Sequence, residues 1–226
     1  MNKVLLEHFF PPKDPFSPPP RLRPQKKAPP LWKEEVATAL SKHSHTSALG
    51  PDGIPYSTWK QVNRISHSVL LEILFPLVSL GYHPASLTGS NGILLDKSGK
   101  PSSKSPASFR IIALIRTVSK ILGRIIVPRL LMAARAKWLL NPNQCGSLPG
   151  LSTYDAVLTL FNYVKTLQRP RLKVSSLFWD IKAGFNKVDN STQARILREG
   201  GIPPYLVSVY RRSLANGAAP SSFRGP

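Results

Sequence analysis

A carboxylate and an aromatic ring, five positions apart, form the first candidate for chemistry. The apolar run over residues 177–179 stops at Asp180, and the small pair 183–184 leads to Phe185. Short apolar runs bounded by turn residues are typical of buried strands, and such a strand would leave Asp180 at a sheet edge where chemistry is commonly placed. The alternative is an ordinary strand-to-loop junction that ends in a solvated Asp, and these residues alone leave both interpretations open.

Cationic side chains on a predicted β-hairpin form the second candidate. Residues 89–97 and 109–115 have the pattern of two strands joined by a long basic loop. Arg110 stands at the start of the second strand and not in the loop, so its guanidinium would be held where it can fork onto phosphate oxygens. Lys97 lies at the opposite end of the loop. The alternative is a solvated basic loop without a ligand.

Amphipathic helices and one rigid turn, around Gly50-Pro51-Asp52-Gly53, would position these groups. The i, i+3, i+4 spacing of apolar residues predicts helices over residues 31–43, from about 56 to 65, and over 68–80, 117–140, 152–167, 191–199 and 203–214. Pro128 is expected to bend or split the longest of them. Ser152 and Asp155 form an acidic capping box, and the apolar face of the helix that follows, which includes Phe161, is predicted to be buried.

The charge balance restricts the partner. The chain has 226 residues with 31 Lys plus Arg against 11 Asp plus Glu, for a net charge of +20 and a pI near 10.6. Such a surplus attracts polyanions, with nucleic acid as the first candidate, and the spread of the basic residues disfavours an anionic membrane surface. No apolar run reaches the ~18 residues of a membrane span, no segment resembles a signal peptide, and a single cysteine, Cys145, excludes an internal disulfide framework. An intracellular compartment fits.

Four motif blocks, in order from about residue 47 to 214, resemble the reverse transcriptase domain of non-LTR (LINE-type) retrotransposons. They are Gly50-Pro51-Asp52-Gly53, the basic hairpin with Phe109-Arg110, the block from Gln144-Cys145-Gly146 to Asp155, and Asp180 with its following turn and Phe185. Each block alone is a common pattern, whereas four in the right order are specific. The resemblance implies an α+β right-hand polymerase fold that is incomplete, with fingers over residues 31–170 and a partial palm over 171–226. The proline density of residues 1–30 indicates a disordered basic linker or tail before the fingers.

The resemblance also implies a role for each candidate residue. Asp180 would be one ligand of two catalytic Mg²⁺ ions, because Mg²⁺ prefers carboxylates and phosphate oxygens and two such ions support an in-line nucleotidyl transfer. Arg110, with Lys97, would hold the triphosphate, and Phe185 would pack under the sugar of the incoming nucleotide. Gln144 and Gly146 fall in a block near template and primer. The implied partners are an RNA template, a DNA primer and deoxynucleoside triphosphates, in the nucleus, with no membrane; the oligomeric state stays open.

Departures from the family pattern limit what the chain is expected to do alone. Asn186 stands where the family has a second acid, Ile111 where it prefers Pro, and Ser147 where it has Phe. The family's Tyr/Phe-x-Asp-Asp block would lie beyond residue 214 and is absent, so the chain is expected to be inactive by itself. The alternatives are a non-enzymatic basic nucleic-acid-binding protein and the non-functional product of a decayed reading frame.

Overall fold

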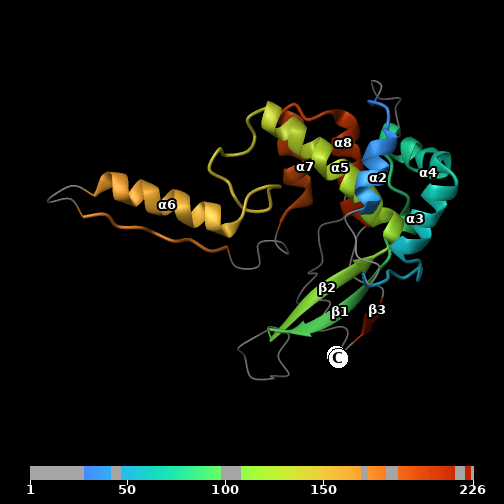
Figure 1. Cartoon of the computed structure of the whole chain (residues 1–226), viewed down its shortest axis with the longest axis horizontal. Helices are drawn as coiled ribbons and strands as arrows, with labels where there is room; N and C mark the ends of the chain where they lie inside the picture. Colours follow the sequence, from blue (N-terminus) through green and yellow to red (C-terminus); the bar gives the residue numbers. More distant parts are fainter. Residues whose placement is uncertain are drawn as a thin grey trace.

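The chain folds as a helical cluster from which a β-hairpin extends. The structure, a computed structural model, describes residues 28–41, 47–97, 108–168, 173–181, 188–216 and 222–224. The Pro-rich segment up to residue 27, the hairpin loop and Phe185 therefore lie outside the described residues. Figure 1 shows most helices gathered at the upper right, helix α6 (Thr153–Leu167) apart from them on the left, and the hairpin running out below the cluster. The predicted α+β class is confirmed.

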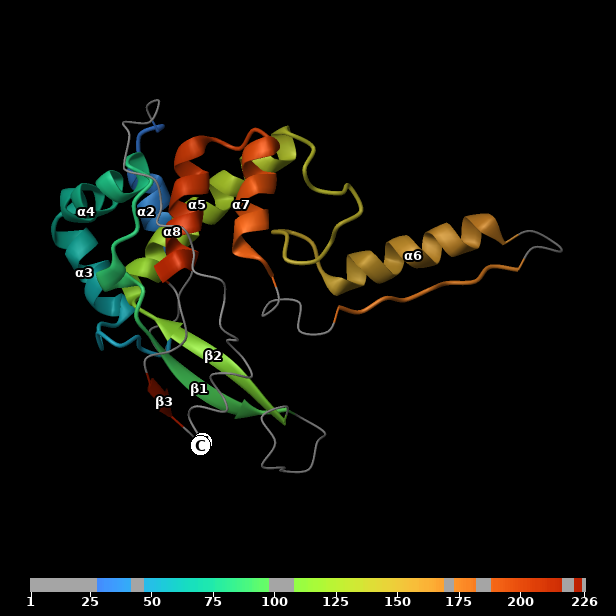
Figure 2. The same ribbon diagram turned by 180° about the vertical axis from the view of Figure 1, so that it is seen from behind.

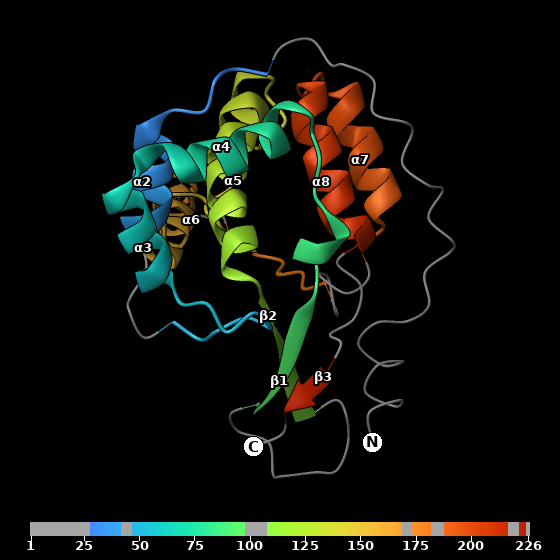
Figure 3. The same cartoon turned by 90° about the vertical axis from the view of Figure 1, so that its right-hand side faces the viewer.

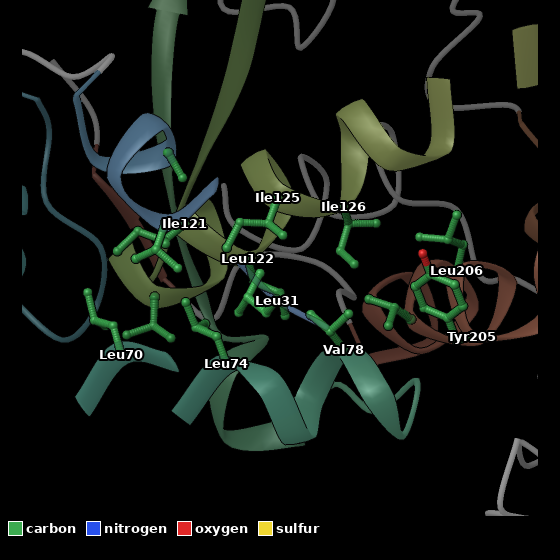
Figure 4. Close-up of a cluster of buried hydrophobic side chains, with 14 of the residues drawn as sticks. Leu31, Leu70, Leu74, Val78, Ile121, Leu122, Ile125, Ile126, Tyr205 and Leu206 are labelled. Atoms are coloured by element: carbon green, nitrogen blue, oxygen red, sulfur yellow. The ribbon is translucent and has the colours of Figure 1, made fainter. Parts of the chain in front are cut away.

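Helix α5 (Thr117–Ala136) is the centre of the helical cluster. Its apolar stripe, predicted from the sequence, is buried against α2 (Lys33–Ser41) and α8 (Pro204–Asn216). Side chains of α4 (His67–Ser79) belong to the same core. Figure 4 shows this core. Its largest fully buried aliphatic side chains are Leu70, Leu74, Ile121, Leu122 and Leu206. Full burial of each such side chain stabilises the fold by about 1.5–3 kcal/mol relative to exposure, so this cluster supplies the main driving force for folding.

The remaining helices follow the sequence pattern closely. Helix α3 (Tyr56–Ile65) packs on α4, and α7 (Asn190–Glu199) packs on α8. Helix α5 continues through Pro128 without being split, and it ends at Ala136, not near residue 140 as the periodicity predicted. Gly200 and Gly201 separate α7 from α8, and Gly201 takes the left-handed backbone (φ +73°) that a helix C-terminus favours. The predicted break between these two helices is confirmed.

The predicted hairpin is present. Strands β1 (Ser90–Asp96) and β2 (Phe109–Ile115) pair antiparallel, with Ser90 opposite Ile115 and Asp96 opposite Phe109. A third strand, β3 (Ser222–Arg224), pairs parallel with the other edge of β1 (Figure 3). Three residues are too few for a periodic pattern, which is why this strand had no sequence signal.

Two predictions of burial are wrong. Helix α6 (Thr153–Leu167) has no buried residue, and its Phe161 is 52% exposed. Residues 173–181 form no strand, and Leu177, Phe178 and Trp179 are 77%, 80% and 86% exposed. Figure 2 shows α6 projecting sideways from the helical cluster. Periodicity records which side of a segment is apolar, but burial also needs a second surface, and none of the described residues supplies one here.

No helix among the described residues is long and apolar enough to cross a membrane.

Candidate nucleic-acid interface

One face of the hairpin carries both predicted phosphate-binding cations. The register places Arg110 opposite Leu95, and residues directly opposite in an antiparallel pair share a face. Lys97 follows Leu95 by two positions and therefore points to that face as well. The backbone N–H of Lys97 donates to the carbonyl of Ser108 at 2.9 Å, which extends the pairing beyond β1. The structure thus brings Lys97 and Arg110 together as diagonal neighbours near the hairpin tip.

Arg116 extends this face to the base of the hairpin, and the sequence analysis missed it. Its extended backbone (φ −57°, ψ 146°) continues the strand alternation six residues after Arg110. Its Nε atom is buried and has no hydrogen-bond partner within the described part of the chain. Between the two arginines the face is mostly apolar, with Ile112 45% exposed, and Asn91 of β1 adds a polar side chain opposite Leu114. The even spacing of the two arginines on one strand was the available signal.

The turn at Gly50-Pro51-Asp52-Gly53 holds the base of the hairpin. Its closing hydrogen bond runs from the Gly53 N–H to the Gly50 carbonyl at 3.1 Å, and Gly53 has φ +64°. A methyl group on Gly50 would lie 2.5 Å from the carbonyl oxygen of Ile115, so the turn passes against the end of β2 where only glycine fits. The predicted rigid turn therefore also packs against the end of β2.

Two side chains from the start of α5 fasten the same segment. The Thr117 hydroxyl donates to the Ile54 carbonyl at 2.6 Å, and Lys120 Nζ donates to the Ala48 carbonyl at 2.9 Å. Burial lowers the pKa of Lys120, and the nearby Asp52 carboxylate partly opposes that shift. The turn, the hairpin base and the central helix consequently form one unit that fixes the direction of the hairpin.

Asp180 is the candidate metal ligand, and it lies in the exposed, extended stretch over residues 173–181. Of the chain's eleven acidic residues, only Glu7 and Asp14 fall outside the described residues. Among the described ones, no group of three or more His, Cys, Asp or Glu side chains gathers where it could hold a metal ion. Asp180 offers one oxygen donor of the kind that Mg²⁺ takes, but the described residues do not make up a two-metal site.

Asp189 has a different, structural role. Its carboxylate accepts hydrogen bonds from the backbone N–H groups of Ser191 and Thr192 at 3.1 and 2.9 Å and caps the N-terminus of α7. Hydrogen bonds from the side chains of Thr192 and Ser191, and then from their N–H groups, hold the pKa of Asp189 well below its usual range. A carboxylate engaged in this way serves as the cap of the helix.

Gln144 and Gly146 lie in the exposed loop between α5 and α6. The Gln144 side-chain amide donates to the Gly146 carbonyl at 3.4 Å, and a methyl group on Gly146 would meet nothing within 4 Å. The loop leads to the predicted capping box, which is present: the Ser152 hydroxyl accepts from the Asp155 N–H, and the Asp155 carboxylate accepts from the Ser152 N–H at 2.7 Å. The hydrogen bonds from Ser152 lower the pKa of Asp155.

Comparison with known proteins adds the family relation. No protein-family profile matches the chain. The chain is 28% identical over 154 residues to a probable RNA-directed DNA polymerase from transposon X-element of Drosophila melanogaster. The aligned region covers 68% of this chain and 17% of that protein. The chain is 24% identical over 159 residues to a probable RNA-directed DNA polymerase from transposon BS of the same organism, covering 70% and 17%.

A third relative is the retrovirus-related Pol polyprotein from type-1 retrotransposable element R2 of Popillia japonica. It is 26% identical over 173 residues, or 76% of this chain and 23% of the polyprotein. The chain therefore spans less than a quarter of the length of these relatives. Over about 70% of its length, the chain is a homologue of the RNA-directed DNA polymerases of non-LTR transposons.

Proposed function

We propose that the chain is the fingers and the first part of the palm of a retrotransposon reverse transcriptase, and that it binds primer and template. The observation that carries the proposal is the match to three transposon polymerases or polyproteins over 68–76% of the chain. In this proposal residues 31–170 are the fingers, residues 171–226 begin the palm, and residues 1–30 are a basic linker. Its place of action would be the nucleus.

The hairpin face supports a contact with nucleotide and nucleic-acid phosphates. Arg110 and Lys97 share that face near the tip, and we assign them to the triphosphate of the incoming deoxynucleotide. Arg116 at the base would add a further contact, because its buried Nε has no hydrogen-bond partner among the described residues. The guanidinium group can donate two parallel hydrogen bonds to phosphate oxygens, so the positions of Arg110 and Arg116 suit arginine better than lysine.

The other carried-over roles complete the proposal. Phe185 would lie under the nucleotide sugar, and the exposed loop with Gln144 and Gly146 would lie along the template and primer. Asp180 would hold one side of a Mg²⁺ site in the assembled polymerase. Since the described acids form no cluster, nucleotidyl transfer would require carboxylates in addition to those that the structure describes.

A salt-dependent binding assay tests the proposal. Fluorescence anisotropy with a labelled RNA–DNA primer-template should give a Kd that rises steeply with salt, because each neutralised phosphate releases counterions. Arg116→Ala should weaken primer-template binding and reduce the slope of log K against log salt by about 1. Arg110→Ala should weaken the binding of a deoxynucleoside triphosphate added to the primer-template complex, which the same assay measures at a fixed salt concentration. Arg195→Ala is the matched control, since Arg195 is exposed on α7, already paired with Glu199, and its loss changes the net charge equally.

The outcomes are distinct. Binding that does not depend on salt, or equal losses for Arg116→Ala and the Arg195→Ala control, would contradict the hairpin as a phosphate-binding face. Primer extension by the isolated chain with Mg²⁺ would contradict the need for additional carboxylates.

No other acid among the described residues gathers around Asp180, and this favours a second candidate, a nucleic-acid-binding protein without catalysis. Supplying the downstream polymerase part of a relative in trans distinguishes the two. If extension appears and is lost with Asp180→Ala, the polymerase assignment holds; if no extension appears, the binding function stands alone.

A further inference from the structure

The C-terminus of α5 is built as a Schellman motif with an unusual residue at its critical position. The Leu139 N–H donates to the Ala134 carbonyl at 3.0 Å, and the Trp138 N–H donates to the Arg135 carbonyl at 3.1 Å. These are the two bonds that define the motif, and they place Trp138 at the position that requires a left-handed backbone. Trp138 has φ +55°.

Glycine is the usual residue at this position, because a Cβ atom is crowded in the left-handed region. A bulky residue there is an outlier, which persists only where the surroundings enforce it. The surroundings fix this cap. The Leu139 side chain packs on Gly200, in the turn between α7 and α8, so closely that a methyl group on Gly200 would lie 2.6 Å from Leu139 Cδ2. The backbone is therefore fixed, and Trp138 carries the strain.

Packing does not account for the choice of tryptophan. The side chain is 84% exposed, so it gains little from burial that could offset the cost of its left-handed backbone. Folding alone would favour glycine or asparagine at this position. The indole fills no space among the described residues, so a ligand outside them would account for its choice.

The surroundings of Trp138 are cationic. Arg135 and Lys137 precede it and are exposed, and the Lys137 stem lies over the turn at Gly201, 3.6 Å from Cε to the position of an added methyl group. The acid at the end of the adjoining helix α7 is Glu199, whose carboxylate is already bound by Arg195 at 3.1 Å. An exposed, rigidly presented indole beside free positive charge fits a ligand with both flat rings and phosphates.

We infer that Trp138 is a stacking platform for a base of single-stranded nucleic acid, with Lys137 and Arg135 binding the adjacent phosphates. This inference rests on the proposed nucleic-acid-binding function and adds a contact remote from the hairpin along the chain. Stacking on an exposed aromatic face is available to every base, so the contact would be independent of sequence. The left-handed backbone presents the ring outward and removes one source of motion that stacking would otherwise have to restrict.

Substitutions at Trp138 test the inference because the stability and binding effects have opposite signs. Trp138→Gly and Trp138→Asn should raise the melting temperature by about 2–4 °C through relief of backbone strain. The same variants should bind a labelled oligouridylate of about ten nucleotides between about fivefold and 150-fold more weakly. Trp138→Phe keeps an aromatic face and should retain binding within about threefold.

One control and one altered ligand separate the possible causes. Trp32→Ala removes an indole that is 60% exposed just before α2 and should leave affinity unchanged. An abasic oligonucleotide keeps the phosphates and removes the bases, so wild type and Trp138→Gly should bind it equally.

Each outcome bears on a defined claim. If the wild-type chain binds no oligonucleotide, the proposed function itself fails. If the wild type binds and Trp138→Gly binds equally well, or if Trp138→Gly melts at a lower temperature, the stacking platform is refuted while the nucleic-acid-binding function stands.

Discussion

Gly50→Ala is the substitution that most directly tests how the hairpin is seated. The new methyl carbon would lie 2.5 Å from the carbonyl oxygen of Ile115 and 2.8 Å from both the carbonyl carbon of Ile115 and Cα of Arg116. All three atoms belong to the backbone, so no side chain can rotate to make room. Either the turn or the end of β2 must move.

The expected cost follows from these contacts. Forcing an extra carbon into a packed site costs about 1–3 kcal/mol. Movement of the turn would also weaken the hydrogen bonds that Thr117 and Lys120 make to the carbonyls of Ile54 and Ala48, each of which contributes about 1 kcal/mol. Replacing glycine offsets about 0.4–1 kcal/mol through the unfolded state. The net loss of about 2 kcal/mol should lower the melting temperature by about 4–8 °C for a chain of this size.

Far-UV circular dichroism melts measure this loss, and Gly123→Ala is the matched control. Gly123 lies inside α5, and a methyl group there would meet nothing within 4 Å. The control should therefore gain up to about 1 kcal/mol from helix propensity. If Gly50→Ala melts at or above the wild-type temperature while Gly123→Ala behaves as expected, the turn does not pack against the end of β2. The contact described between Gly50 and Ile115 would then be refuted.

Three further predictions concern the ion pair and the helix caps. Glu35→Gln should destabilise the protein by about 1–3 kcal/mol, because the mostly buried Arg129 would lose its counter-charge. Arg129 Nη2 lies 2.6 Å from the Glu35 carboxylate. A double-mutant cycle with Arg129→Met measures the interaction energy of the pair. Ser152→Ala should remove about 0.5–2 kcal/mol from α6 alone, seen as faster amide hydrogen exchange there at an unchanged melting temperature, because α6 has no buried residue. The pKa of Asp189 is lowered by folding, so its contribution to stability is fully present above the unfolded pKa of about 3.9 and is lost as the pH falls below it. Asp189→Asn should therefore flatten the acid side of the plot of melting temperature against pH. In the same variant, the hydrogen-exchange protection factors of α7, which are corrected for the intrinsic exchange rate, should not change with pH.

The local features of the chain were predictable from neighbouring residues. The apolar spacing from Val118 to Ile126 places those side chains on one face of α5 whatever surrounds it, because the 3.6-residue period alone gathers them on one side. The capping box at Ser152 and the turn at Gly50-Pro51-Asp52-Gly53 likewise depend on contacts between residues only three positions apart. The order of the motif blocks was also sufficient to predict the relation to transposon polymerases that the comparisons show.

The long-range features depended on the tertiary structure. Phe161 belongs to an amphipathic helix, but only the arrangement of the whole chain shows that its face has no cover among the described residues. The steric need for glycine at position 50 comes from Ile115, which lies far along the sequence.

Trp138 shows the division most clearly. Its residue type and its charged neighbours can be read from the sequence, whereas its left-handed backbone and its exposure follow from where α5 ends and what packs on that end. Sequence determines which side chains a segment offers and how its own backbone tends to fold. Burial, strain and the pairing of distant groups are decided only when separate segments meet, because each is a property of two surfaces and not of one.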